Sequence, residues 1–236
     1  MRSFFTFGPI KSIDYGVWIS GEGTFNRTKR SYTEKAIPGR NGTLLIDNGR
    51  FENQSLEYPA FIAEDMPGHI DAFLNDLASL TGYQRLEDTY HPYEYRMAQF
   101  TGEVKVKTEG YMNRHGGFDI VFNTKPQRYL KSGEMAIAFT ANGDILNRTQ
   151  MPSKPFLRIF GTAAGTVGIA SETITISAID GYVDIDCEIL DAFKGTTNCN
   201  GNVSFTGAIT IPAGKHGITM TGGITKVEIT PRWYII

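Results

Sequence analysis

The sequence has few of the side chains that usually carry out chemistry. Among 236 residues there are 4 His and 2 Cys. The cysteines, Cys187 and Cys199, are too few for a disulfide framework, and no histidine stands near them at the spacing of a structural zinc site. The motifs of serine hydrolases, P-loop proteins and zinc proteases are absent. We therefore expect a protein that is not an enzyme and that holds no cofactor and no metal.

The sequence also lacks an excess of charge and long apolar runs. It has 23 Lys and Arg residues against 25 Asp and Glu residues, with no long basic block. Specific nucleic-acid binding, which needs a positive field, is therefore not expected. No apolar run approaches the roughly 20 residues that span a bilayer. The first residues reach Gly8, Pro9 and Lys11 before an uninterrupted apolar stretch forms, so we expect no secretory signal and expect folding in the cytoplasm.

What the sequence does have is glycine, aromatic residues and short alternating segments. There are 26 Gly, 15 Phe and 11 Tyr, and the hydrophobic share of 41% is enough for a folded core. Strands are predicted wherever polar and apolar residues alternate or an extended run lies between turn formers. These segments are 13–20, 31–37, 43–46, 56–63, 103–107 and 118–122, and then 156–160, 173–177, 182–187, 217–220 and 226–230. The pattern predicts an all-β protein.

One helix is predicted, between Met66-Pro67-Gly68 and Gly82. It has an apolar stripe at helical spacing, consisting of Ile70, Phe73, Leu74, Leu77 and Leu80. Such a helix usually covers a sheet of its own domain, although a helix that recognises a partner has the same pattern.

Two domains are expected, residues 1–130 and residues 131–236. The segment 125–133 lacks periodicity and contains Pro126, which favours a linker. Beyond it no helical pattern occurs. Asp180-Gly181 is a favoured hairpin turn and predicts that 173–177 pairs with 182–187, and Gly222-Gly223 predicts another turn. Short strands at this spacing indicate a β-sandwich or barrel.

Three groups of residues could carry chemistry. Asp184, Asp186 and Glu188 would share one face of a strand, as in a metal or acid–base site, but the apolar residues between them favour a solvated outer face with Lys or Thr neighbours. Tyrosines at 90, 93 and 95 could stack on sugars, although packing is favoured. None of the four histidines has a nucleophile motif beside it, so ordinary surface positions are expected for all of them. They are His69, His91, His115 and His216.

Several motifs, in order along the chain, resemble the distal tail protein (Dit) family of long-tailed, non-contractile bacteriophages. In the first half these are Asp14–Val17, Pro38–Leu44, Tyr83–Asp88 and Tyr95–Ala98. In the second half they are Val183–Glu188, Ile211–Gly214 with Ile218, and Glu228–Trp233. The family often has an aromatic residue before the proline near the C-terminus, where this sequence has Ile211-Pro212.

The resemblance implies an N-terminal β-sandwich with one helix and a protruding hairpin, which forms a hexameric ring, single or stacked. It implies a C-terminal galectin-like β-sandwich. The implied function is that of a structural virion protein, a hub at the tail tip that joins the tail tube to the baseplate and host-adsorption apparatus. The implied partners are copies of itself, the tail tube protein and tail-tip, tail-fibre or receptor-binding proteins, assembled in the bacterial cytoplasm.

Two segments are candidate contacts between the subunits of such a ring, because each is too polar or glycine-rich for a core and yet lies between strong strands. The first is the loop 38–42, with Gly39, Arg40 and Asn41. The second is the hairpin end 109–117, with Tyr111, Asn113 and Arg114. A closed ring needs head-to-tail contacts of this kind.

Two other classes of function are alternatives to a structural role. The C-terminal sandwich could be a carbohydrate-binding module for host glycans, since galectin-like folds bind sugars on a Trp platform. Trp233, the one Trp of that half, stands beside Pro231-Arg232 near the chain end, where edge packing suits it better. A peptidoglycan-cleaving enzyme has no supporting motif.

Overall fold

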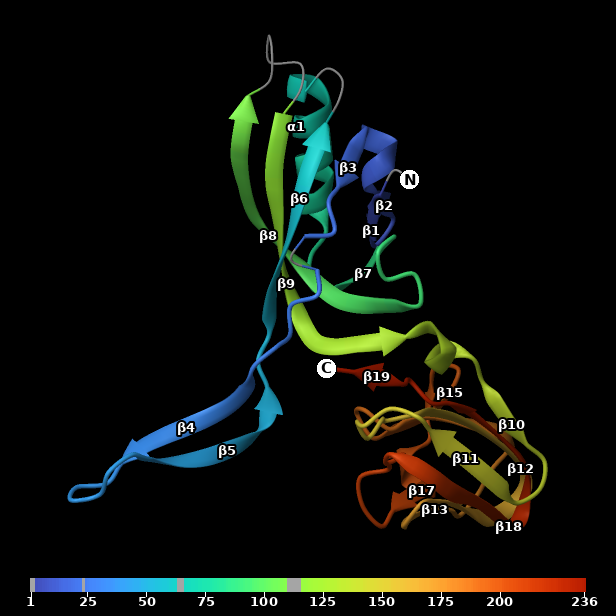
Figure 1. Ribbon diagram of the computed structural model, residues 1–236. Coiled ribbons are helices and arrows are strands. Elements are labelled where there is room, and N and C mark those ends of the chain that lie inside the picture. The colour runs from blue at the N-terminus through green and yellow to red at the C-terminus, as the bar shows by residue number, and fades with distance from the viewer. Residues whose placement is uncertain (1–2, 23, 63–65, 110–115) are drawn as a thin grey trace. The chain divides into compact units, whose positions relative to one another are not determined.

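The computed structural model describes residues 3–22, 24–62, 66–109 and 116–236, without the side chains of 66–69, 105–109 and 116 (Figure 1). Within these ranges there is one α-helix, and strands dominate, so the predicted all-β fold is confirmed. The chain divides into two compact units, unit 1 up to Arg128 and unit 2 from Tyr129 to Ile235.

The main sheet of unit 1 has the strand order β2-β1-β7-β8-β9-β6-β3. Its strands are β1 (Phe5–Phe7), β2 (Ile10–Lys11), β3 (Val17–Ile19), β6 (Gln54–Ile62), β7 (Gln84–Asp88), β8 (Glu94–Glu109) and β9 (Gly116–Leu130). Helix α1 (Met66–Ser79) covers one face of this sheet, as the apolar stripe predicts. Phe73 and Leu77 of the helix are fully buried and belong to one core with Phe5, Tyr58 and Phe122. The ring of Phe5 contacts Phe122 edge-on, with centroids 5.4 Å apart.

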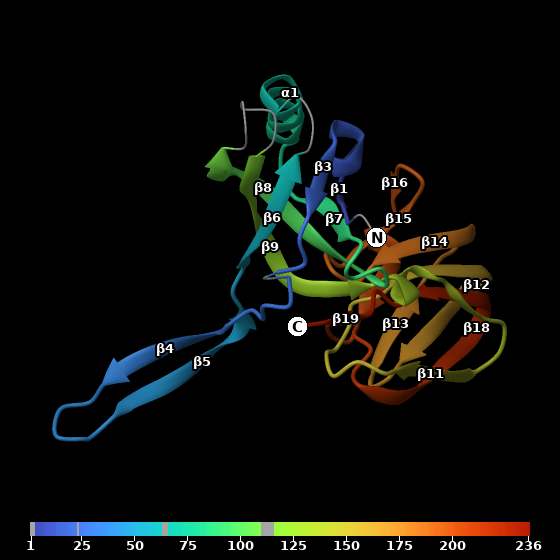
Figure 2. The ribbon, with the colours of Figure 1, turned by 45° about the horizontal axis from the view of Figure 1, so that its top comes forward.

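Two strands of unit 1 stand apart from this sheet. β4 (Arg30–Ala36) and β5 (Thr43–Phe51) form a separate two-stranded ribbon and pair with each other. Figures 1 and 2 both show the ribbon projecting from the rest of unit 1. We call residues 27–52, which contain both strands and the loop between them, the arm.

The structure corrects two expectations in unit 1. Residues 13–15 are not strand, because Ser12–Tyr15 form a 3₁₀ turn that ends at Gly16 with φ of 70°, and β3 begins after it. The segment 125–130 is not a linker but the end of β9. The pairing of β9 with β6 reaches Thr124, so Pro126 lies beyond that ladder and leaves its hydrogen bonds intact.

Unit 2 is built around two long antiparallel strands, β12 (Phe156–Ile169) and β18 (Gly214–Thr230). The other strands are β10 (Ile137–Phe139), β11 (Gly143–Asn147), β13 (Glu172–Ile176), β14 (Gly181–Asp186), β15 (Asp191–Lys194), β16 (Thr197–Asn198), β17 (Val203–Phe205) and β19 (Tyr234–Ile235). A bulge interrupts the β12–β18 register at 161–165.

This bulge overturns two predictions. β13 and β14 do not form the predicted hairpin, because β14 pairs with Phe156–Gly161 of β12 and β13 pairs with Gly165–Ile169, on the two sides of the bulge. Gly222-Gly223 is not a turn between strands but part of β18, opposite the bulge. One pair of long strands thus takes part in both halves of the curled sheet.

Candidate assembly interface

The arm has exposed apolar side chains on both faces. Leu44, Leu45 and Ile46 are 42%, 53% and 45% exposed. Because consecutive strand residues point to opposite faces, Leu45 lies on one face and Leu44 and Ile46 lie on the other. A two-stranded ribbon has no core of its own, and its apolar residues stay in water unless another surface covers them. The arm is therefore a surface suited to a partner.

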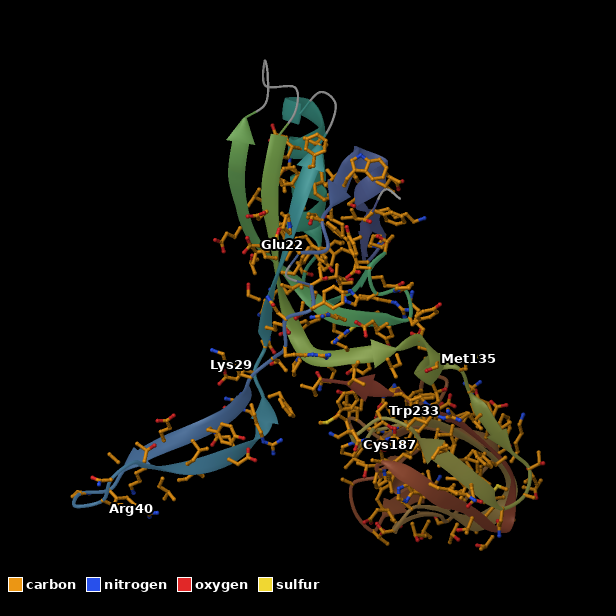
Figure 3. All side chains as sticks on the ribbon, in the orientation of Figure 1. Glu22, Lys29, Arg40, Met135, Cys187 and Trp233 are labelled. Carbon is orange, nitrogen blue, oxygen red and sulfur yellow. The ribbon has the colours of Figure 1, made fainter. Side chains whose placement is uncertain are left out.

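The predicted contact residues Gly39, Arg40 and Asn41 lie together in the loop at the end of the arm, and all three are exposed. Figure 3 shows Arg40 at this end and Lys29 at the base. Gly39 and Gly42 have φ of 78° and 82°, a left-handed conformation that favours glycine in a tight connection. The other predicted residues, Tyr111, Asn113 and Arg114, lie outside the described residues.

The segment that leads from β3 into the arm is held firmly. Thr24 is buried, its Oγ1 donates a hydrogen bond to Gly21 O (2.8 Å), and its own O accepts one from Arg96 Nη2 (3.0 Å). The ring of Tyr90 lies against Gly21, where a Cβ atom would be 2.6 Å from it. The sequence indicates a turn at Gly21 but has no signal for the contacts that Tyr90 and Arg96 make with this segment, which join residues about 70 positions apart.

Beside this segment is a cluster of buried charged side chains. Glu94, Arg96 and Arg128 are all buried, and Glu94 Oε1 accepts hydrogen bonds from Arg128 Nε (2.8 Å) and Nη2 (2.5 Å). Burial lowers the pKa of Arg96 from its ordinary value. Because each charge is paired or hydrogen-bonded, the arrangement is that of a structural network holding the base of the arm.

The same cluster continues through Asp88. Its Oδ2 accepts a hydrogen bond from Tyr58 Oη (2.7 Å), and its Oδ1 lies 3.0 Å from His91 Nδ1. Burial, followed by the neighbouring Asp88 carboxylate, raises the pKa of Tyr58 well above its ordinary value. His91 is therefore not an ordinary surface histidine, since its side chain packs in this network and against Phe25.

The carboxylates of unit 2 correct a further expectation. Asp184 is 4% exposed rather than solvated, and Arg158 binds it in a bidentate manner (2.6 and 2.8 Å). Arg232 binds Asp186 in the same way (2.7 and 2.9 Å) and thereby lowers the pKa of Asp186. Glu188 lies beyond the end of β14, so the three acids do not share a strand. Within the described part of the chain, no group of acidic, His and Cys side chains could hold a metal ion.

The aromatic residues that could stack on sugars are mostly packed. Trp233 belongs to the core of unit 2, which agrees with edge packing (Figure 3). Tyr95 has the Arg85 guanidinium 3.8 Å above its ring, and Tyr90 lies against Gly21. Tyr93 is 82% exposed.

Among the described helices none is long and apolar enough to cross a membrane.

The two thiols should differ sharply in reactivity. Cys187 is buried, which raises its pKa to about 12, whereas Cys199 is half-buried. Since the thiolate is the reactive form, a disulfide reagent at pH 8 should modify about one thiol per folded chain within minutes. A Cys199→Ala variant should show no modification until denaturant is added. Rapid reaction of both thiols in the native protein would show that the core around Cys187 opens readily.

Comparison with known proteins gives a match in structure but none in sequence. No family model matches the sequence, and no curated protein matches it. Among solved structures, SPP1 Dit (gp 19.1), described as a paradigm of the hub adsorption apparatus in phages that infect Gram-positive bacteria, matches with a TM-score of 0.76. The match covers 100% of both chains at 11% sequence identity. Over its whole length, this chain has the fold of the phage protein Dit.

Proposed function

We propose that this chain is a structural protein of a phage tail, a distal tail protein at the tail tip. The observation that carries the proposal is the full-length fold match to SPP1 Dit, which includes both units of the chain. It is supported by the composition, which is poor in reactive groups, and by the pairing of the second unit's carboxylates with arginines rather than with each other. A structural role needs no catalytic residue, and we propose none.

In this role the N-terminal domain, residues 1–130, forms a hexameric ring, single or stacked. The C-terminal domain, residues 131–236, is a galectin-like sandwich. The ring joins the tail tube protein to the baseplate and to receptor-binding or fibre proteins, and it assembles in the bacterial cytoplasm before host attachment by the virion. The arm supports a ring because it offers an apolar surface outside the core of its own unit.

The mass of the protein in solution tests this proposal. Six copies of a 26.1 kDa chain give a ring of about 157 kDa. We expect multi-angle light scattering at increasing protein concentration to approach this mass, and electron microscopy of that fraction to show six-fold rings. A chain that stays monomeric at every concentration, and also with the neighbouring tail proteins present, would contradict the proposal.

The loop at the end of the arm should contribute to the ring. Replacing Arg40 and Asn41 together by Ala is expected to lower the hexamer fraction at a given concentration several-fold, because their polar side chains are exposed at the candidate contact. The matched control is Arg148→Ala, another exposed arginine, in unit 2, which should leave the mass unchanged. Equal hexamer fractions for both variants would remove the loop from the interface.

A further inference from the structure

Unit 1 has a groove on the sheet at its β3 edge. It has a volume of about 390 Å³ and its lining includes Trp18, Pro59, Phe61, Gly117 and Asp119. The strand register places Trp18 opposite Phe61, and Phe61 opposite Gly117. Phe61 is 48% exposed. Because Gly117 has no side chain, the groove stays open beside the Phe61 ring.

One face of the arm matches this groove in character. In the β4–β5 register Leu44 is paired with Lys35 and Ile46 with Thr33, so these four side chains share a face. Leu45 is paired with Glu34 and therefore lies on the opposite face. The first face is apolar and basic, and the second is apolar and acidic.

The arm and the rest of unit 1 carry opposite net charges. The arm, residues 27–52, has six Lys and Arg residues against three Asp and Glu residues, a net charge of +3. The rest of unit 1, residues 1–26 and 53–128, has nine against thirteen, a net charge of −4. Glu57 lies two residues before Pro59 on β6, and therefore on the same sheet face as the groove, where it supplies a carboxylate, whereas Asp119 of the lining is buried. The arm is thus attracted to the body of a copy of its own chain.

Within a single chain the arm does not fill the groove. Its apolar residues are exposed and the groove is open in the same structure. A contact between an arm and another copy's groove uses two different surfaces and is therefore head-to-tail, the type that closes into a ring.

We infer that Leu44 and Ile46 of one copy insert into the groove beside Phe61 of the next copy, with Lys35 facing Glu57. The inference rests on the proposed ring and names the two surfaces that form its contact. Since the contact combines apolar burial with an attraction between opposite charges, association should weaken as salt rises from 50 to 500 mM.

Disulfide trapping between two variants tests the contact directly. Ile46→Cys and Phe61→Cys are made separately in the full chain with Cys199→Ala, so that only the buried Cys187 remains besides the new thiol. Mixing the two variants under mild oxidation is expected to give a covalent dimer as the main product. The matched control mixes Leu45→Cys, on the other face of the arm, with Phe61→Cys, and should give at least tenfold less dimer.

A variant that fills the groove provides the second measurement. At Gly117 a Cβ atom would have only Ala60 O within 4 Å, at 3.9 Å, so Gly117→Leu should fold normally. It is expected to abolish the covalent dimer and to reduce the ring fraction more than tenfold, with unchanged thermal unfolding.

The outcomes separate this inference from the proposed function. Six-fold rings in every variant, without a 46–61 disulfide, would overturn the contact and leave the ring intact. An efficient 46–61 disulfide with a mass that never reaches six copies would uphold the contact and contradict the hexamer. Trapping of Phe61→Cys by a neighbouring tail protein, rather than by the arm, would assign the groove to that protein and overturn the inference.

Discussion

The Glu94→Gln variant is expected to lose about 3–5 kcal/mol of the free energy of unfolding of unit 1. The substitution keeps the size of the side chain and removes its charge. The Arg128 guanidinium, which makes two hydrogen bonds to Glu94 Oε1, would then be buried without its counter-charge and close to the buried guanidinium of Arg96. The loss is measured by urea unfolding, with the hydrogen exchange of peptides from unit 1 as the readout.

Two further variants show whether the effect belongs to the pair. Arg128→Met should cost less than Glu94→Gln, because Arg96 still lies near the Glu94 charge. The double variant Glu94→Leu with Arg128→Met should recover most of the loss, since no unpaired charge of the pair remains. The matched control is Asp47→Asn on the arm. Its ion pair with Arg30 is exposed, and no measurable change is expected. Equal, small losses for Glu94→Gln and Asp47→Asn would show that burial of the pair is unimportant.

Sequence patterns identify elements well where one face of a segment is buried. The helix is predicted at its observed position, and the predicted strand Phe118–Phe122 lies within the longer strand β9, because their apolar side chains repeat with the period of a helix or a strand. The pair of Glu94 and Arg128 has no such pattern. These residues are 34 positions apart and meet through the placement of β8 and β9 in the sheet.

The arm shows a different limit. Its strands and its loop are predicted near their observed positions, but their exposure is not. Three consecutive apolar residues, Leu44-Leu45-Ile46, are typical of a strand that is buried on both faces. The same three apolar residues are also expected in a strand whose two faces are covered by other molecules. A single sequence therefore does not distinguish a core strand from an arm that binds a partner.

The second unit shows why local turn signals can mislead. Asp180-Gly181 has the composition of a hairpin turn, yet the flanking strands pair with different halves of β12. The cause lies in the bulge of β12 at 161–165, where the glycines of β12 and β18 approach each other. The bend thus determines which strands pair. It involves residues about 60 positions apart in the sequence, such as Ala163 and Gly223, and a four-residue turn motif carries no information about them.

Adding a methyl group at this bulge is expected to be strongly destabilising. At Gly165 a Cβ atom would lie 2.3 Å from Thr221 O, and at Gly223 it would lie 2.5 Å from Ala163 N. Both contacts are with backbone atoms, which cannot move aside as a flexible side chain does. Gly165→Ala and Gly223→Ala should therefore each lower the free energy of unfolding of unit 2 by about 3 kcal/mol. The change is measured by urea unfolding, with the fluorescence of the buried Trp233 as the readout.

Gly217→Ala is the matched control because Gly217 is in the same strand, β18, and a Cβ atom there would have no neighbour within 4 Å. Alanine loses less backbone entropy on folding than glycine, so this variant should be unchanged or more stable by up to about 1 kcal/mol. Equal stabilities of all three variants would mean that the bulge can relax without cost. A loss confined to Gly165→Ala and Gly223→Ala would identify close backbone packing as what bends β12 and so determines which strands pair in unit 2.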